Sequence, residues 1–270
     1  MSIYDIIGEI SEKQATKTET GDARIYGVVV GIVAKNYDKD MPGRVCVTIP
    51  TRDSSKNELQ WARQALPSSG SDWGYYFVPE VGDQVLLAFE GGNIEKPYVI
   101  GCLPKENSKL VSKTVDAQNQ YKRIMTKNGS SITFEDNQEG SGEKDKITVE
   151  TAGSAHTVLL DNENKLIRIS DKKKENMVEL KTEAGEMTVK CKSRLTVQVG
   201  DSIKITLNGE SGSVSVSAKE FSVKTSGSVQ LKTDSMLKLE GAQFNAKASS
   251  VFKVESSGMV NVSGSTIKLG

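Results

Sequence analysis

Residues 214–269 read VSVSAKE FSVKTSGS VQLKTDSM LKLEGAQ FNAKASSV FKVESSGM VNVSGST IKL, spaced here into repeating units. Each unit opens with two apolar residues separated by one other residue. This alternation of period two is typical of a short β-strand with one buried face. The residues between the pairs are mainly Ser, Gly, Thr, Lys and Asn, which favour turns. The stretch therefore predicts a regular series of short strands and turns.

The interval between successive apolar pairs is 7 or 8 residues throughout this stretch. A fixed period with one strand per repeat indicates a solenoid-like rod, in which no repeat buries its apolar face alone. Hydrophobic residues make up 36% of the chain, which is low for a globular protein and fits a thin rod. The pattern favours a structural rod over an enzyme with a pocket.

The charge balance of the chain predicts no nucleic-acid partner. Its 270 residues include 35 Lys and Arg and 35 Asp and Glu, so the formal net charge is zero. Residues 1–104 hold 10 basic and 14 acidic residues, and the remaining 166 residues hold 25 and 21. A protein that binds a polyanion usually presents a clearly basic face.

Residues 1–23 are expected to form a short helix and a linker. Ile3, Ile6, Ile7 and Ile10 follow a helical spacing, and a polar stretch comes after them. The helix would either pack on its own domain or dock on a partner. The N-terminus lacks the features of a signal peptide, and no apolar stretch is long enough to cross a membrane. The sequence therefore predicts synthesis in the cytoplasm without a signal peptide.

Residues 24–104 predict a compact β domain. Strands are expected at 24–33, 44–50, 61–65, 74–79, 82–89 and 96–103. Gly27 and Gly31 mark points where the first strand bulges or curls, and residues 38–43 and 90–93 are expected to be turns. Five or six short strands bent by glycines are typical of a small closed barrel such as the OB-fold.

Residues 105–146 are polar and predict a neck with one weak strand at 132–134. Beyond the neck, apolar pairs return at intervals of 8 to 11 residues, with charged turns at 161–165 and 171–176. These pairs are Ile147/Val149, Val158/Leu160, Ile167/Ile169, Val178/Leu180, Met187/Val189, Leu195/Val197 and Ile203/Ile205. The predicted fold class is all-β: an OB-fold barrel over 24–104, followed by a β-helical rod over 147–270.

An intertwined trimer would cover the apolar rows of the rod. Burying one aliphatic side chain contributes roughly 1.5–3 kcal/mol, whereas ordering each residue costs roughly 1–2 kcal/mol. A single chain with two inward residues in about eight does not offset that cost. Several chains around one axis would bury the rows and pair the strand edges. The repeat is about a third of the ~20 residues of a single-chain solenoid coil, so three chains forming a β-prism are expected.

The predicted trimer core consists of the inward residues of the repeats. They are Val214, Val216, Phe221, Val223, Val229, Leu231, Leu237, Leu239, Phe244, Phe252, Val254, Val260, Val262, Ile267 and Leu269. The lysines between them, such as Lys232 and Lys238, occupy outward positions and are expected to be solvated.

Six stretches carry a resemblance to a known family. In order they are YGVVVGIV (26–33), GRVCVTIP (43–50), WAR (61–63), GYYFVPEVGDQVL (74–86), FEGG (89–92) and PYVIG (97–101). Together they resemble the OB domain of contractile-tail spike proteins. That family includes phage central spikes, baseplate assembly protein V and the valine-glycine repeat spikes of type VI secretion systems.

The resemblance implies a homotrimer with an OB collar below the tail tube and a triple-stranded β-helix that pierces the target envelope when the sheath contracts. The chain lacks the large hub domain of type VI spikes, so a separate baseplate hub protein at the OB end is implied. It also lacks a lysozyme-like insert and the His-x-His pair of some phage tips, so a tip-capping protein could bind the C-terminal end. The protein would belong to a phage tail, a tailocin or another contractile injection particle, and it would contact the target envelope transiently.

No catalytic, cofactor-binding or metal site is predicted. His156 is the single histidine, and its sequence neighbours supply neither a nucleophile nor an orienting partner. One histidine excludes a histidine-rich metal site within one chain. Asp38, Asp40, Glu135 and Asp136 are explained by turn chemistry and lack the spacing of a calcium loop.

The cysteines and the glycine-rich turn give no further site. Cys46, Cys102 and Cys191 have neither a disulfide framework nor metal-ligand spacing, and Cys46 is expected to be a packed thiol. The stretch EGGN at 90–93 does not match a phosphate-binding loop.

Two other functions stay open. Trp73, Tyr75, Tyr76 and Phe77 are expected in the barrel core and in subunit packing, but such aromatics can also stack on bases. The alternative function is therefore an OB-fold nucleic-acid-binding module on a β-rich oligomerisation stalk. A surface-acting β-helical glycan hydrolase would need a carboxylate cluster on one face, and none occurs at a spacing that matches the repeat.

Overall fold

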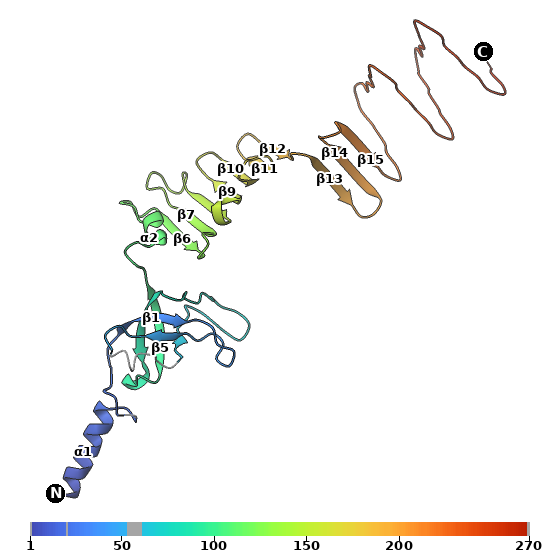
Figure 1. Ribbon diagram of the computed structural model, residues 1–270. Helices are drawn as coiled ribbons and strands as arrows, with labels where there is room; N and C mark the ends of the chain where they lie inside the picture. The colour runs from blue at the N-terminus through green and yellow to red at the C-terminus, as the bar shows by residue number, and fades with distance from the viewer. Residues whose placement is uncertain (1, 20, 53–60, 269–270) are drawn as a thin grey trace. The chain divides into compact units, whose positions relative to one another are not determined.

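The computed structural model describes residues 2–19, 21–52 and 61–268 (Figure 1). The chain divides into two compact units. The first consists of Met1–Leu195 and Leu207–Ser213, and the second consists of Thr196–Thr206 and Val214–Gly270. Within the described ranges, α1 (Ile3–Thr16) and α2 (Lys109–Thr114) are the α-helices, and the other regular structure consists of strands and short 3-10 turns. The prediction of an all-β fold is confirmed.

Helix α1 forms where the isoleucine spacing predicts it. Its first turn is closed by a capping interaction: the Asp5 carboxylate accepts a hydrogen bond from the Ser2 amide at 2.7 Å, and the Ser2 hydroxyl accepts one from the Tyr4 amide at 3.3 Å. All four isoleucines of the stripe are exposed, and no residue of α1 is buried. The expectation that α1 packs on its own domain is therefore wrong, because nothing in the described chain covers its apolar side. Docking on a partner remains a prediction.

The C-terminal end of α1 is fixed to the barrel by Arg24. Its Nε donates to the carbonyl oxygens of Gln14 and Lys17 at 3.0 and 3.1 Å, and its Nη1 donates to the Gly91 carbonyl at 2.9 Å. The last turn of a helix leaves carbonyl oxygens without helical partners, so the guanidinium satisfies groups that would otherwise need water.

Five strands form the barrel: β1 (Val29–Lys35), β2 (Cys46–Thr48), β3 (Arg63–Gln64), β4 (Gln84–Phe89) and β5 (Pro97–Leu103). Their order in the sheet is β2-β1-β4-β5-β3, antiparallel except for the β3–β5 pair. An antiparallel bridge between Val45 and Ala62 joins β3 back to β2, with N–H···O distances of 3.1 and 2.8 Å. The sheet is therefore closed, which confirms the barrel expected from the sequence.

The barrel interior is filled by aliphatic side chains from alternate strand positions. Val33, Val45, Val47, Val85 and Leu87 are all at most 1% exposed. The wall is tight at Gly31, where a Cβ atom, if present, would lie 2.7 Å from the Cδ1 atom of Leu87. A side chain at position 31 would therefore collide with the core, which accounts for the glycine in β1. Cys46 is buried, as expected.

Two predictions in the barrel region need correction. The first strand begins at Val29, not at residue 24, because the backbone of residues 24 and 25 bonds to Thr16 and Gly92 instead of to a neighbouring strand. Residues 74–79 form no strand. Trp73, Tyr75, Tyr76 and Phe77 are exposed, so they do not belong to the barrel core. The turn expected at 90–93 is present as the short helix η2 (Glu90–Gly92), with positive φ at Gly91 and Gly92.

A seven-stranded antiparallel sheet follows α2 (Figure 1). Its strands run in chain order: β6 (Tyr121–Met125), β7 (Ser131–Glu135), β8 (Lys146–Glu150), β9 (His156–Asp161), β10 (Leu166–Asp171), β11 (Met177–Lys181) and β12 (Glu186–Lys190). The short helix η3 (Ala152–Ser154) lies between β8 and β9. The strand expected at 132–134 is β7, but β6 was not predicted. Because both pair into the same sheet as β8, residues 105–146 are more than a connecting neck.

The apolar pairs after this sheet first form strands and then an extended chain. The strands β13 (Arg194–Val199), β14 (Ile203–Asn208) and β15 (Ser213–Ser217) make a three-stranded sheet. Residues 218–268 contain no assigned strand, and Figure 1 shows them as a zigzag. Bends fall at 219, 226–227, 234–235, 242, 249–250, 257–258 and 265, which keeps the repeat seen in the sequence. The strands expected there have no pairing partner within one chain.

The barrel core yields a stability prediction. Replacing Leu87 with Ala should lower the free energy of unfolding of the barrel by about 2–5 kcal/mol, because the side chain is fully buried. Leu86→Ala is the matched control: this neighbouring residue is half-buried, and its loss should be about 1 kcal/mol or less. Both tryptophans, Trp61 and Trp73, lie in the barrel region, so urea unfolding followed by their fluorescence reports on it. Equal losses in the two variants would contradict the described core.

Candidate functional site

The seven-stranded sheet places most of its apolar side chains on one face and most of its polar side chains on the other. Cross-strand partners lie on the same face of a sheet, and the register aligns the apolar residues of all seven strands. The first row contains Ile124, Ile132, Val149, Val158, Ile169, Val178 and Val189. The second contains Phe134, Ile147, Leu160, Ile167, Leu180 and Met187. We call these two rows the apolar face.

The opposite face carries polar and charged pairs that satisfy one another. Arg168 on β10 lies across from Glu179 on β11 and forms an ion pair with it at 2.7 Å. Arg123 on β6 donates from Nε to the hydroxyl of Thr133 on β7 at 2.9 Å. Such cross-strand pairs are suited to contact with water. In the described chain this polar face is the less exposed of the two, with Ser131, Thr133 and Ser170 all buried, whereas the apolar face lies largely open.

Within the described residues, most of the apolar face is uncovered. Ten of its thirteen side chains are between 36% and 66% exposed, and the other three are half-buried. An exposed apolar patch that runs across seven strands is far more than the scattered apolar residues found on soluble surfaces. It is therefore a candidate assembly surface.

The side chains predicted as a trimer core continue the same pattern toward the C-terminus. Val214 and Val216 lie in β15, and the others from Phe221 to Ile267 lie in the extended segment. All fourteen predicted core residues that the structure describes are 47% to 75% exposed, and Leu269 lies outside the described residues. One chain therefore does not bring them together, and their role in a trimer core remains a prediction.

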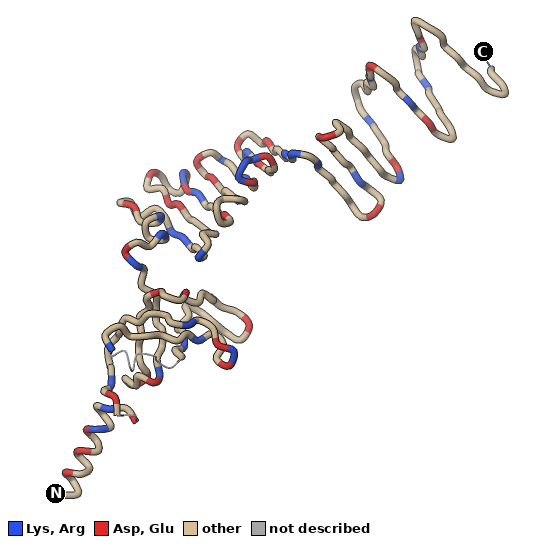
Figure 2. Tube along the Cα trace, in the orientation of Figure 1, with Lys and Arg blue, Asp and Glu red and all other residues tan. Residues whose placement is uncertain are grey.

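The outward positions of the extended segment are polar or charged, as the alternation predicts. Lys238 forms an ion pair with Glu240, and Lys253 forms one with Glu255, each two residues apart on the same side of the backbone. Figure 2 shows basic and acidic residues interspersed through this segment and through the barrel region. Exposed pairs of this kind contribute little stability and mainly keep the surface solvated.

Sequence reasoning missed the start of the apolar face. Ile132 and Phe134 on β7 follow the same alternation as the later pairs, so this signal was available in the sequence. On β6, the position two residues before Ile124 is Lys122, which faces Phe134 across the sheet. A strand with only one apolar residue on its inner side gives no periodic signal, which is why β6 was not predicted.

The turns of the sheet are stabilised by aspartates. Asp161, which is buried, ends β9 and accepts hydrogen bonds from the backbone and side-chain nitrogens of Asn164 at 3.0 and 2.9 Å. Its burial raises the pKa, but the bonds from Asn164 and the charge of Lys146 outweigh this and hold the pKa below its ordinary value. Asp171 has the same role after β10: chiefly through the Asn176 side chain, hydrogen bonding lowers its pKa. Both predicted charged turns are therefore present and internally bonded.

The residues considered as catalytic or metal-binding candidates do not lie together in one site. Among the residues that the structure describes, no three His, Cys, Asp or Glu side chains lie close enough to hold a metal ion. His156 is exposed at the start of β9, where its backbone N–H donates to the Thr151 hydroxyl at 3.0 Å. Asp38 acts within its turn, accepting from the amides of Asp40 and Met41 at 2.9 and 3.1 Å. No described helix is long and apolar enough to span a membrane.

Comparison with known proteins identifies the barrel. Residues 29–103 match the family model of the type VI secretion system/phage-baseplate injector OB domain. The chain is 32% identical over 113 residues to the type VI secretion system spike protein VgrG3 of Vibrio cholerae, an alignment that covers 37% of this chain and 11% of that protein. It is 33% identical over 83 residues to the spike protein VgrG2a of Pseudomonas aeruginosa, which covers 30% of this chain and 10% of that protein.

A third relative has a different name. The chain is 27% identical over 113 residues to the actin cross-linking toxin VgrG1 of Vibrio cholerae, covering 37% of this chain and 10% of that protein. The chain thus matches only about a tenth of the length of these curated relatives. The resemblance to baseplate and spike proteins is confirmed, and the match to the family model confirms the OB-fold of the barrel.

The turn geometry predicts a pH-dependent loss of stability. Asp161→Ala should lower the free energy of unfolding at neutral pH by about 1–3 kcal/mol, because buried hydrogen bonds are left unmade. The folded-state pKa is lowered, so this contribution is complete above the unfolded pKa near ~3.9 and is lost as pH falls through the folded value. The difference between wild type and variant should therefore be constant down to about pH 5 and shrink as the pH falls below about 4.

The measurement is thermal unfolding followed by circular dichroism at each pH. Glu163→Ala is the control, because Glu163 forms an exposed ion pair with Lys146 at 2.7 Å and such pairs contribute little. A difference between wild type and Asp161→Ala that stays constant with pH would contradict the assigned role of the carboxylate.

Proposed function

We propose that this chain is the structural spike of a contractile injection machine or phage-like tail baseplate, and that it acts as a homotrimer. The observation that carries the proposal is the apolar face. It crosses the whole seven-stranded sheet, lies uncovered in one chain, and is followed by regular apolar pairs up to Ile267. The match of residues 29–103 to the injector OB domain supports the choice of machine.

Three copies would cover this face by directing it toward a common axis. Burial of apolar surface stabilises by about 25 cal/mol per Å², and the other copies would supply the cover that most of this face lacks within the described residues. In the segment 218–268 the backbone also lacks strand partners, and neighbouring copies would supply them. A repeat of 7 or 8 residues suits one face of a three-sided prism, in which each chain contributes one strand per layer.

The proposed division of the chain follows from these parts. Residues 1–23 are an N-terminal helix and linker, 24–104 the collar, 105–146 a neck, and 147–270 the rod. Strands β6 and β7 extend the apolar face into the neck, so the rod would begin earlier than its strict repeat. The trimer would be rigid, because its layers are joined by strand pairing and a dry axial row.

The proposed action is mechanical and not enzymatic. Contraction of a sheath would drive the rod through a target envelope, which it contacts only transiently. A separate hub protein would bind at the OB end, and a tip-capping protein could bind at the C-terminal end. The chain would be made in the cytoplasm and would become part of a phage tail or injection particle.

One observation favours the nucleic-acid alternative. Trp73, Tyr75, Tyr76 and Phe77 are exposed on the barrel, where aromatic side chains could stack on bases. The region 1–104 holds more acidic than basic residues, which opposes binding to a polyanion. Salt-dependent retention of single-stranded DNA by the purified protein would favour the alternative over the spike.

The axial rows yield a sharp assembly test. The double variant Val229→Asp, Leu231→Asp should fail to form a trimer, because it would place six carboxylates in one dry layer of the axis. Gln230→Asp is the matched control: this residue lies between the two and points outward, so the variant should assemble like the wild type. Sedimentation velocity distinguishes the two results. A stable, soluble trimer from the double variant would contradict the packing of the rod.

The function itself is tested in a strain that produces contractile particles and encodes this protein. Deletion of its gene should prevent the assembly of complete baseplates, as judged by electron microscopy of purified particles. Restoring the wild-type gene should recover complete particles, whereas the Val229→Asp, Leu231→Asp variant should not. Complete, contraction-competent particles in the deletion strain would rule out the proposed role.

A further inference from the structure

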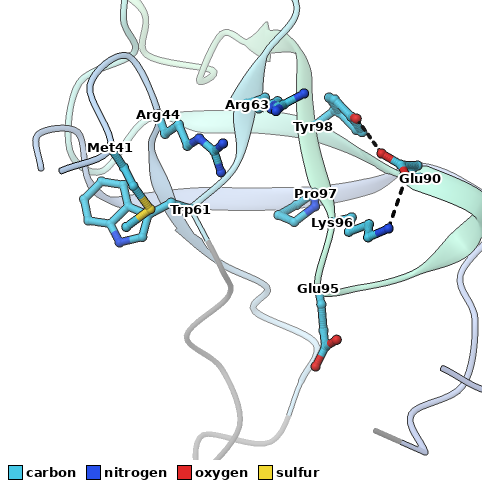
Figure 3. Close-up of a pocket in the computed structure, with 9 residues that line it drawn as sticks. All are labelled: Met41, Arg44, Trp61, Arg63, Glu90, Glu95, Lys96, Pro97 and Tyr98. Atoms are coloured by element: carbon cyan, nitrogen blue, oxygen red, sulfur yellow. Dashed lines mark hydrogen bonds and ion pairs between the residues drawn. The ribbon is translucent and has the colours of Figure 1, made fainter. Parts of the chain in front are cut away.

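A pocket of about 270 Å³ opens on the wall of the barrel and plays no part in the proposed assembly (Figure 3). Four of the stretches that carry the family resemblance supply side chains to it. Arg44 comes from GRVCVTIP, Trp61 and Arg63 from WAR, Glu90 from FEGG, and Tyr98 from PYVIG. Residues far apart in the sequence are thus collected at one place on the barrel surface.

Closure of the barrel places two arginines side by side. Val45 and Ala62 are bridge partners and lie fully buried inside the barrel. In an antiparallel bridge the residue before one partner faces the residue after the other, so Arg44 lies opposite Arg63 on the outer side. Arg63 is also paired in register with Tyr98 on β5. Like charges directly opposite each other are destabilising unless an anion lies between them.

The acidic residues of the pocket form no ion pair with these arginines among the described residues. Glu90 accepts a hydrogen bond from the Tyr98 hydroxyl at 2.7 Å and one from Lys96 at 3.3 Å, which are drawn in Figure 3. The Tyr98 bond, then Lys96 and, least, the charge of Arg63 hold the pKa of Glu90 below its ordinary value, so both direct bonds of this carboxylate go to Tyr98 and Lys96. Among the ion pairs of the described residues, none includes Arg44 or Arg63.

The charge of the pocket lining fits a single negative charge. Arg44, Arg63 and Lys96 give three positive charges, and Glu90 and Glu95 give two negative charges, which leaves one positive charge. A carboxylate balances this charge and can accept two parallel hydrogen bonds from a guanidinium. A phosphate dianion would exceed it and would be repelled by Glu90.

We propose that this pocket binds the carboxylate of an acidic side chain on a docked partner protein, with an apolar neighbour of that residue against Trp61. Trp, Tyr and Arg are the residue types that dominate the energy of protein interfaces. The volume is below the ~300–1,000 Å³ of small-molecule sites and suits one or two side chains. The proposal depends on the barrel alone and does not rest on the proposed trimer.

The test uses Trp61 as its own reporter. The background is the full-length Trp73→Phe variant, which leaves Trp61 as the single tryptophan. The probe is the dipeptide N-acetyl-Asp-Phe-amide, titrated at low salt while Trp61 fluorescence is recorded. N-acetyl-Asn-Phe-amide tests the need for the charge, and inorganic phosphate tests whether any anion suffices. Arg63→Gln and Arg44→Gln remove one guanidinium each, and Arg194→Gln on the exposed part of β13 is the matched control.

The acidic dipeptide should give a saturable signal. Each pocket variant, as well as the change to the Asn dipeptide, should weaken binding about tenfold or more, because a charge-assisted bond is lost. Arg194→Gln should bind like the background, and urea unfolding of each variant confirms that its barrel is folded. The proposal is overturned if the acidic dipeptide gives no saturable signal or if both dipeptides bind equally. It is also overturned if phosphate binds as tightly as the acidic dipeptide, or if both pocket variants bind like the background.

Discussion

The rest of the structure depends on one constraint: the apolar face of the seven-stranded sheet is largely uncovered within the described chain. Alternation places two aligned rows of apolar side chains from β6 to β12 on one side, and the paired polar residues lie on the other side together with Leu159 and Leu166. Most of the side chains on that apolar side are exposed in the described chain. We propose that a partner supplies the cover, and the repeat toward the C-terminus favours a second and third copy of this chain as that partner.

The barrel, in contrast, buries its own apolar side chains within one chain. Its five strands curl and close through the Val45–Ala62 bridge, so residues such as Leu87 are fully buried without help. Gly31 allows the wall to approach this core closely. One chain thus combines a domain that completes its own core with a sheet that does not. This contrast fits a collar that folds alone and a rod that acquires its interior only on assembly.

Much of this could be predicted from the sequence, because alternation and turn residues are local signals. The pairs from Ile147 to Val189 became strands, and the turns at Asp161 and Asp171 formed as expected. Alternation does not say what covers a face, so neither the exposed loop around Tyr76 nor the uncovered side of α1 could be predicted. The pocket at Arg63 could not be predicted from the sequence either, since it depends on which outward residues the closed barrel brings together.

The central claim is that three chains direct their apolar faces toward one axis, and the most direct measurement is the solution mass of the purified full-length protein. Light scattering on a sizing column gives this mass independently of particle shape. Three chains of 29.2 kDa predict a mass of 87.6 kDa, with an elution volume typical of an elongated particle. A monodisperse monomer of 29.2 kDa would contradict the account, because the apolar face would then be stable in water without a partner.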